Sequence, residues 1–564
     1  MLVRMQALDW VVVAAYFCLL VWIVYRSSLH QSTSADYFLA GRHIGWFVVG
    51  CSLFASNIGS EHIVGLAGGG ANNGMAQAHW ELHAWIMIVL AWVFVPFYYR
   101  SGVFTMPEFL ERRYSSQTRW VLSVVSLVAY VFTKVSVTVY AGAIVFQTLL
   151  PDTFGSPDNA FWVGAFSTVL LTGVYTVFGG LRAVVYTEVA QTFILLLGSG
   201  LITWFGLSAL GGWSELIASC KPNAANFALW RPNTDPNFPW LGVMIASPVV
   251  GIWYWCTDQY IVQRTLAARS LADARRGAIW GGFLKLWPVM IFLVPGMIGF
   301  ALHQKGLLHI PLKTDGSGGL LGDAVFATMV QSLLPVGLRG LVVAGLLSAL
   351  MSSLASLFNS CATLFTVDIY EKLRPGQSEQ TLVRVGRMAT GFVVVCGLIW
   401  IPIMKKISEG NTGLYDYLQN VQGFLAPPIT AVFLLGLFSK RITAPAALWG
   451  LVVGFVLGMG KLTIQTLAKS GTLAADGMLK AIGDYNGYYF SGVLFVFSMF
   501  FVVLVSMFTP APTEAKVLGL TYASTTPEQR AENRASWGMA DVAGTVVVLG
   551  LVATIYTYFT FWLD

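Results

Sequence analysis

The stretch CSLFASNIGSEH, residues 51–62, decides how we interpret the rest of the chain. It begins inside an apolar run but carries three serines, Asn57, Gly59, Glu61 and His62. Backbone that departs from a helix at membrane depth occurs only where it is buried in protein or lines a watery cavity. We therefore expect this interrupted helix to bind a substrate or an ion. The alternative is a helix that packs on its neighbours through small residues.

The composition is that of a membrane protein with many spans. Hydrophobic residues make up 56% of the 564 residues and charged residues only 11%, with a mean hydropathy of +0.68. These values lie far from those of a soluble globular domain. No signal-peptide cleavage pattern follows the first apolar segment, so we expect it to be a retained helix. Five of the six cysteines lie in apolar spans, which excludes a disulfide framework.

Apolar segments long enough to cross a membrane, about 20 residues each, recur along the whole length. The sequence predicts 14 of them, near 9–26, 45–71, 80–99, 119–149, 160–178, 183–209, 240–263, 277–302, 339–369, 385–404, 414–438, 445–466, 487–508 and 539–562. No stretch remains in which an enzyme domain can fold, so we expect an all-α polytopic membrane protein and no enzyme. The polar segment at 509–538 is predicted to be flexible.

The basic residues predict the orientation. With the N-terminus outside, most of the 33 Lys and Arg residues fall in loops on the inner side, as the positive-inside rule requires. The net charge of +6 therefore reflects topology, and we expect no nucleic-acid partner. Both termini are predicted to lie outside.

A second interrupted span resembles the first. Residues 240–263 contain Ser247, Pro248 and Gly251, followed by the polar run Cys256-Thr-Asp-Gln259. Five spans separate equivalent points of the two breaks. A pair of broken helices at matching positions indicates a transporter built from inverted repeats.

Two groups of residues can supply the chemistry. Serines at 348, 352, 353 and 356 lie on neighbouring faces of one predicted helix. Their hydroxyls, and the carbonyls freed at Ala55 and Ile58, offer hard oxygen ligands for Na⁺. The alternative is that these small residues only let the helices pack closely. Ionisable residues within spans are functional candidates because their burial in lipid is costly. These are Glu61, His62, Glu81, Lys134, Glu188, Asp258 and Lys285. Glu81 and Lys285 can pair or bind hydroxyls, Lys134 is expected to have a structural role, and Asp258 can form a helix-end pair with Arg264.

With Asn57, His62 and Gln419, the Glu81 and Lys285 side chains make a set of directional donors and acceptors. Aromatic residues at 80, 254, 255 and 415 offer flat apolar faces. A sugar needs both, because it has many hydroxyls to satisfy and C–H faces to stack.

Long collinear runs resemble the solute:sodium symporter family, and within it the sodium/glucose cotransporters. The runs are LFASNIGSEHIVGLAG (53–68), GVFTMPEFLERRY (102–114), YTVFGGLRAVVYTE (175–188), WYWCTDQYIVQR (253–264), LKLWPVMIFLVPGMI (284–298), GLLSALMSSLASLFNSCATLFTVDIY (345–370) and DYLQNVQGFLAPPITAVFLLGLFSKR (416–441). They cover roughly 37–441, with weaker similarity to about residue 508. This extent makes chance similarity among hydrophobic helices implausible.

The resemblance implies a LeuT-like fold of two inverted five-helix repeats within one transporter domain, 1–564. An extra N-terminal helix (9–26) precedes the first repeat (45–209) and the second (240–438), and three C-terminal helices (445–564) follow. The implied sodium ligands are backbone oxygens of Ala55, Ile58 and Ala349 and hydroxyls of Ser352 and Ser353. The implied sugar contacts are Asn57, His62, Glu81, Tyr254, Trp255, Lys285 and Gln419. The implied gates are Leu66, Trp80, Tyr254 and Tyr415, and Glu188 stands at a position linked to sodium coupling.

Four positions depart from the family pattern. Glu61 replaces a glycine usual in the animal transporters, and Glu188 replaces a common aspartate. Ala355 stands where members thought to bind a second sodium carry a hydroxyl, which favours one Na⁺ per sugar. Trp80 is larger than the usual phenylalanine or tyrosine, so the pocket size is open.

We therefore expect a secondary active transporter in which Na⁺ is the co-transported ion and a hexose, glucose or galactose, is the solute. The alternatives are a Na⁺-coupled myo-inositol or polyol symporter and a sugar-gated sensor or leak channel. Short loops and the absence of extracellular cysteines favour a bacterial inner membrane. No obligatory protein partner is evident. The preferred solute, the oligomeric state and the role of Glu61 stay open.

Overall fold

The computed structural model describes residues 5–28, 33–151, 153–313, 319–408, 414–474 and 477–564. Within these ranges the chain is helical and contains isolated bridges but no strand. Twelve stretches are long and apolar enough to cross a membrane. Two of these stretches, 60–101 and 157–210, each contain residues of two successive predicted spans. The 12 stretches therefore correspond to the 14 spans that the sequence predicts. The all-helical fold class is confirmed.

The main helices follow the chain in this order. They are α1 (Ala7–Ser28), α2 (Ser34–Leu39), α3 (Trp46–Asn57), α4 (Ser60–Asn73), α5 (Ala78–Glu81), α6 (Ala84–Val89), α7 (Val95–Ser101), α8 (Met106–Arg113), α9 (Ser116–Ala129), α10 (Ser136–Leu149), α11 (Pro157–Leu210), α14 (Trp240–Ile252), α15 (Gln259–Leu266), α16 (Leu271–Leu284), α17 (Val294–Gln304), α18 (Gly322–Leu333), α19 (Leu338–Thr363), α21 (Glu379–Ser408), α22 (Leu414–Phe438), α23 (Ala444–Lys469), α24 (Met478–Asp484), α25 (Gly487–Met507), α26 (Pro527–Ala535) and α27 (Met539–Phe561).

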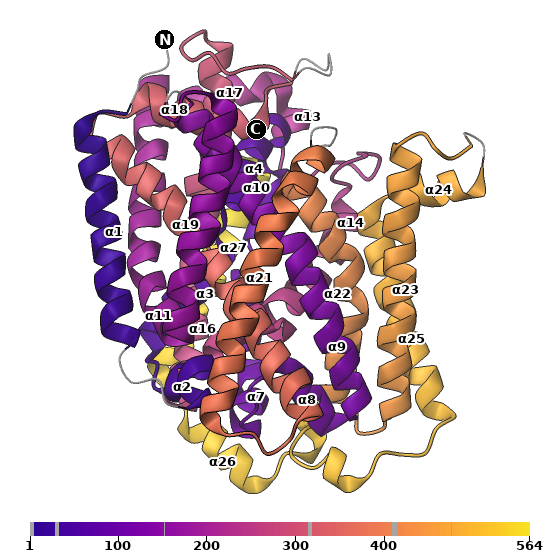
Figure 1. Ribbon diagram of the computed structural model, residues 1–564. Coiled ribbons are helices and arrows are strands. Elements are labelled where there is room, and N and C mark those ends of the chain that lie inside the picture. The colour runs from indigo at the N-terminus through magenta and orange to yellow at the C-terminus, as the bar shows by residue number, and fades with distance from the viewer. Residues whose placement is uncertain (1–4, 29–32, 152, 314–318, 409–413, 475–476) are drawn as a thin grey trace.

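The helices form one bundle whose long axes run roughly the same way (Figure 1). Helix α1 lies at one edge of the view and α23 to α25 at the other. The N and C labels both lie at the end opposite α2, α7, α8 and α26, as an even number of crossings requires. Helix α19 is almost wholly buried within the bundle, whereas α1 and α27 expose most of their surface.

Two helices are interrupted near the middle of the bundle. Helix α3 ends at Asn57, Ile58 and Gly59 adopt extended backbone, and α4 begins at Ser60. Helix α14 contains Pro248 and passes through a π-helical segment, Trp253–Thr257, to an extended Asp258 before α15 begins. Extended residues leave carbonyls and N–H groups without helical partners, so both breaks present free backbone groups.

The proline at 288 explains a third interruption. Proline has no N–H, and its ring clashes with the carbonyl four residues earlier. Helix α16 accordingly ends at Leu284, and Lys285 is its C-terminal cap residue. The interruption places the lysine at mid-bundle.

The segment 509–538, which the sequence predicts to be flexible, contains α26 and two short 3₁₀ turns. It is bound to the bundle by specific contacts. The guanidinium of Arg100 donates to the carbonyl of Gln529 at 3.0 Å, and that of Arg275 donates to the side chain of Asn533 at 2.5 Å.

Candidate functional site

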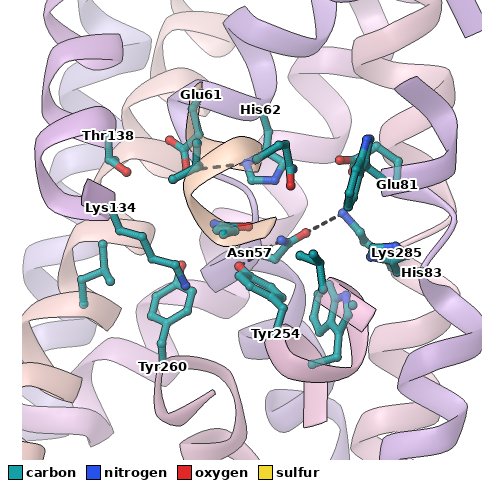
Figure 2. A pocket seen from close by; sticks show the side chains of 18 residues that line it. Asn57, Glu61, His62, Glu81, His83, Lys134, Thr138, Tyr254, Tyr260 and Lys285 are labelled. Atoms are coloured by element: carbon teal, nitrogen blue, oxygen red, sulfur yellow. Dashed lines mark hydrogen bonds and ion pairs between the residues drawn. The ribbon is translucent and has the colours of Figure 1, made fainter. Parts of the chain in front are cut away.

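A cavity lies where the breaks in α3–α4 and α14–α15 face each other (Figure 2). The space between its lining atoms, with the open solvent at its mouth included, is about 560 Å³. Residues of α5, α10, α16 and α22 complete the wall. Of the seven predicted substrate contacts, all line this cavity: Asn57, His62, Glu81, Tyr254, Trp255, Lys285 and Gln419.

Asn57 joins the two breaks. Its amide Nδ2 donates to the hydroxyl of Tyr254 at 3.1 Å, and its Oδ1 accepts from the Lys285 ammonium at 2.6 Å. The contact with Lys285 is drawn in Figure 2. The helix end at Asn57 fixes the direction of this side chain, because the residue closes α3 and the backbone turns away at Ile58. One amide thus links three interrupted elements.

Lys285 and Glu81 form the buried ion pair that the sequence allows. The ammonium lies 2.5 Å from Glu81 Oε2, and both side chains are almost completely buried. The ammonium also lies 5.7 Å from the ring centroid of Trp255, within cation–π range. Removing one member of such a pair leaves an uncompensated charge, so the pair also holds α5 against α16.

Lys134 is held at the opposite side of the cavity. It pairs with Asp258 at 2.9 Å and lies 4.5 Å and 4.3 Å from the ring centroids of Tyr254 and Tyr260. Its expected structural role is thus supported. The sequence also allows an ion pair between Asp258 and Arg264, and this prediction is wrong. The Arg264 guanidinium lies 3.6 Å from the Glu188 carboxylate instead. Residues six apart on a helix point to different faces.

The remaining predicted contacts are His62 and Gln419. The Nδ1 of His62 accepts the N–H of Gly59 at 3.3 Å, which orients the imidazole. The Oε1 of Gln419 is buried and has no hydrogen-bond partner among the described residues. A buried amide oxygen that lines a cavity and lacks a partner is a candidate acceptor for a bound hydroxyl.

The predicted gate residues are placed as follows. Leu66 is fully buried in α4, and Trp80 lies over the cavity, with its ring centroid 5.6 Å from that of Tyr488. Tyr254 lies on the other side of Asn57. The side chain of Tyr415 lies outside the described residues.

The predicted sodium ligands converge beneath the first break. The Ser352 hydroxyl lies 2.9 Å from the carbonyl oxygen of Ala55 and 3.0 Å from that of Ala349. The Ser353 hydroxyl donates to the neighbouring carbonyl of Ser56 at 3.3 Å, and Ile58 forms the break itself. All five residues are buried. Neutral carbonyl and hydroxyl oxygens of this kind are the ligands of Na⁺ in broken-helix transporters.

Glu188 lies within reach of the same region. Its carboxylate accepts the hydroxyls of Ser52, Ser56 at 2.8 Å and Ser356 at 2.5 Å, and Arg264 lies 3.6 Å away. The Ser56 side chain therefore binds Glu188 while its carbonyl accepts from Ser353. The acid is connected to the predicted sodium ligands through one residue.

Sequence reasoning missed several lining residues. Thr138, His83, Tyr260 and Gln422 also face the cavity. The Tyr260 hydroxyl donates to the carbonyl of Ser56, which links α15 to the first break. Only their polar character within spans distinguishes these residues in the sequence, and many packing residues share that feature.

Comparisons with known proteins identify the family of this chain. A family model described as the sodium:solute symporter family matches residues 37–454. The sodium/glucose cotransporter 1 of Oryctolagus cuniculus is 38% identical over 539 residues, which cover 90% of this chain and 80% of the relative. The sodium/myo-inositol cotransporter of Canis lupus familiaris is 36% identical over 554 residues, 92% of this chain and 76% of the relative.

A solved structure shares the fold. It is the substrate-bound outward-open state of a Na⁺-coupled sialic acid symporter, with a TM-score of 0.75 at 22% sequence identity. The match covers 90% of this chain and 99% of the other. At this identity the likeness concerns the arrangement of the helices.

Proposed function

Since this chain belongs to the sodium:solute symporter family, we propose that it couples inward movement of Na⁺ to uptake of a hexose, glucose or galactose. The observation that carries the proposal is the shared break at Asn57–Ser60. The side chain of Asn57 faces the cavity, whereas the carbonyl of Ala55, two residues earlier, accepts from the serine on α19. One interruption thus serves two neighbouring sites.

The sugar is held by hydroxyl-binding groups above this break. We assign Asn57, His62, Glu81, Lys285 and Gln419 to its hydroxyls and Trp255 to a C–H face. The Gln419 amide oxygen supports the assignment because it is buried and accepts no hydrogen bond from the described residues. Tyr254 closes the pocket on the inner side, and Leu66, Trp80 and Tyr415 close it on the outer side.

Sodium binds below, at the carbonyls of Ala55, Ile58 and Ala349 and the hydroxyls of Ser352 and Ser353. The short distances among the oxygens of Ser352, Ala55 and Ala349 support this assignment. A sodium ion replaces the serine–carbonyl hydrogen bonds with shared coordination. Glu188 couples to the site through Ser56. Because residue 355 is an alanine, we propose one Na⁺ per sugar.

The energetics of one-to-one coupling are favourable. Moving one charge through ~100 mV contributes about 2.3 kcal/mol, and a tenfold sodium gradient contributes roughly 1.4 kcal/mol. The sum, about 3.7 kcal/mol, sustains a sugar gradient of roughly 500-fold. A ligand shifts a conformational equilibrium only through its differential affinity for the two states. Sodium must therefore favour the state in which the Asn57 side chain completes the sugar site.

The second candidate solute is myo-inositol. It is favoured by the 36% identity to a sodium/myo-inositol cotransporter, close to the 38% to a sodium/glucose cotransporter. Both solutes offer rings of hydroxyls to the same groups.

The chain is an integral multi-pass membrane protein. We propose that it resides in a bacterial inner membrane with both termini outside, that it works without an obligatory protein partner, and that it catalyses no reaction.

Uptake into proteoliposomes tests the proposal. Radiolabelled glucose, galactose and myo-inositol are offered with an inward Na⁺ gradient or an equal K⁺ gradient. We expect accumulation above equilibrium only with Na⁺, and the solute with the largest overshoot identifies the substrate. Equilibration without overshoot, or current without accumulation, would instead indicate a uniporter or a sensor.

A further inference from the structure

The carboxylate of Glu61 lines the cavity, and no lysine or arginine among the described residues forms a direct ion pair with it. Glu61 is only 7% exposed, and its Oε2 has no hydrogen-bond partner among the described residues. Figure 2 places the side chain at the cavity wall, between those of Thr138 and His62. Ionisable groups within spans mark functional sites because their burial is costly.

Both lysines of the cavity are engaged elsewhere. The Lys285 ammonium lies 2.5 Å from Glu81, and the Lys134 ammonium lies 2.9 Å from Asp258. Lys134 also interacts with Glu61 electrostatically, but its direct ion pair is with Asp258. Two ammonium groups thus serve three carboxylates, and Glu61 is the one that makes no direct ion pair with a lysine or arginine among the described residues.

The neighbouring His62 lies near the carboxylate but makes no direct hydrogen bond to it through its nearer nitrogen. Its Nδ1 lies 3.6 Å from Glu61 Oε1, beyond hydrogen-bond distance. The same nitrogen accepts the N–H of Gly59 at 3.3 Å. A nitrogen that accepts a hydrogen bond carries no proton to donate, so it offers the carboxylate none.

The N-terminus of helix α4 explains how a negative charge on Glu61 is tolerated. Glu61 lies in the first turn of α4, where the helix dipole favours negative charge. The carboxylate folds back over the break, since a methyl group on Gly59 would lie 2.3 Å from Glu61 Oε2. This position stabilises the acid, and the side chain still lines the cavity.

We propose that Glu61 binds the protonated amine of an amino sugar, a hexose in which one hydroxyl is replaced by an amino group. An ammonium N–H donates a charge-assisted hydrogen bond to the carboxylate and compensates its charge. A neutral hexose supplies hydroxyls but no charge. The proposal rests on the proposed function, because the other sugar hydroxyls use the same groups as glucose does. Glu61 then determines specificity within the sugar site.

Competition for sodium-driven uptake tests the proposal. The competitors of radiolabelled glucose in proteoliposomes are glucosamine and its isomers with the amino group at carbon 3 or carbon 6. Each amino sugar is compared with the deoxy sugar that lacks the hydroxyl at the same carbon. We expect at least one amino sugar to inhibit at a concentration roughly tenfold lower than its deoxy partner, the size of one hydrogen bond to a charged group. Equal inhibition by every pair would overturn the proposal.

Two variants assign the effect to Glu61. Glu61→Gln keeps the size and removes the charge, and Glu514→Gln removes a carboxylate from an exposed loop as the matched control. The preference for an amino sugar over its deoxy partner should fall to near one in Glu61→Gln and should persist in Glu514→Gln. A Glu61→Gln variant that loses glucose and amino sugar alike, or keeps the preference, contradicts the assignment.

Calorimetry separates this proposal from the proposed function. Amino sugars are titrated into purified wild-type protein and Glu61→Gln in Na⁺ buffer, which requires no transport. Tighter binding of an amino sugar to the wild type alone supports the Glu61 site even if glucose uptake proves independent of Na⁺. The uptake assay gives the opposing outcome. If Glu61→Gln changes only the ratio of Na⁺ flux to sugar flux, the carboxylate binds a second cation and the proposal is overturned.

Discussion

Asn57 shows at the scale of one residue how two binding events can be joined. Its side chain contacts Tyr254 and Lys285, and its own backbone belongs to the break that exposes the carbonyls of Ala55 and Ile58. A ligand on either side changes the position of the same few atoms. Coupling between sites requires such a shared element whose state both ligands bias.

The Ser353 hydroxyl is the sharpest test of the sodium site. Ser353→Ala should raise the Na⁺ concentration for half-maximal uptake by roughly tenfold, because one oxygen ligand to a cation is lost. Ser348→Ala is the matched control, since the Ser348 hydroxyl bonds to the carbonyl of Ala344 within its own helix. Sodium-dependent uptake curves measure both. An unchanged curve for Ser353→Ala would remove this residue from the site.

Gln419 tests the sugar site without disturbing an ion pair. Gln419→Ala should weaken glucose binding about three- to tenfold, the worth of a neutral hydrogen bond, with sodium affinity retained. Glu81→Ala should also weaken sugar binding, but it leaves the Lys285 ammonium buried without its partner. Calorimetry with glucose measures the effect.

The control for Gln419→Ala is Gln465→Ala, because the Gln465 amide oxygen is also buried without a partner but lies outside the cavity. Equal glucose affinity in wild type and Gln419→Ala would exclude this residue from the sugar site.

At the scale of the helix, function depends on where regular structure stops. The break at Ile58–Gly59, the π-helical segment before Asp258 and the helix end at Lys285 lie around one cavity. Continuous helices would satisfy these backbone groups internally and turn the side chains elsewhere. Close contact between α4 and α17 holds one of the broken elements in place.

Gly296 makes this contact possible. A methyl group at Gly296 would lie 2.0 Å from the carbonyl oxygen of Ala67 on α4, so a helix would have to move. Gly296→Ala should cost about 1–3 kcal/mol and lower the melting temperature of the purified protein by several degrees. Gly460→Ala, which meets no atom within 4 Å, should not lower it. A Gly296→Ala variant as stable as the wild type would refute the close packing.

At the scale of the whole molecule, the orientation in the membrane is a prediction from the placement of the basic residues. The two termini lie at one end of the bundle and α7, α8 and α26 at the other (Figure 1). Arg100 and the basic end of α8 lie at this second end, which the positive-inside rule assigns to the cytoplasm.

Cysteine labelling tests the orientation. In a variant that lacks the six native cysteines, Ser470→Cys should react with a membrane-impermeant maleimide on intact cells, because the loop after α23 is predicted to lie outside. Gln380→Cys, equally exposed but at the start of α21, should react only after the membrane is opened. The reverse pattern would invert the topology.

The sequence by itself determined the class of molecule, because the length and spacing of apolar segments depend only on membrane thickness. It also located both breaks, since Gly59, Pro248 and the polar runs beside them are local backbone signals. Through the resemblance to the family it selected seven residues that line one cavity, and their contact with a sugar stays a prediction.

Only the tertiary structure decided which charged side chains form ion pairs. Lys134 pairs with Asp258 and Arg264 approaches Glu188, although Asp258 and Arg264 are close in sequence. Ion pairs between helices depend on the rotation and depth of each helix, and periodicity fixes neither. The same holds for Glu61, whose lack of a direct ion pair with either lysine becomes visible only when both lysines are seen to bind other carboxylates.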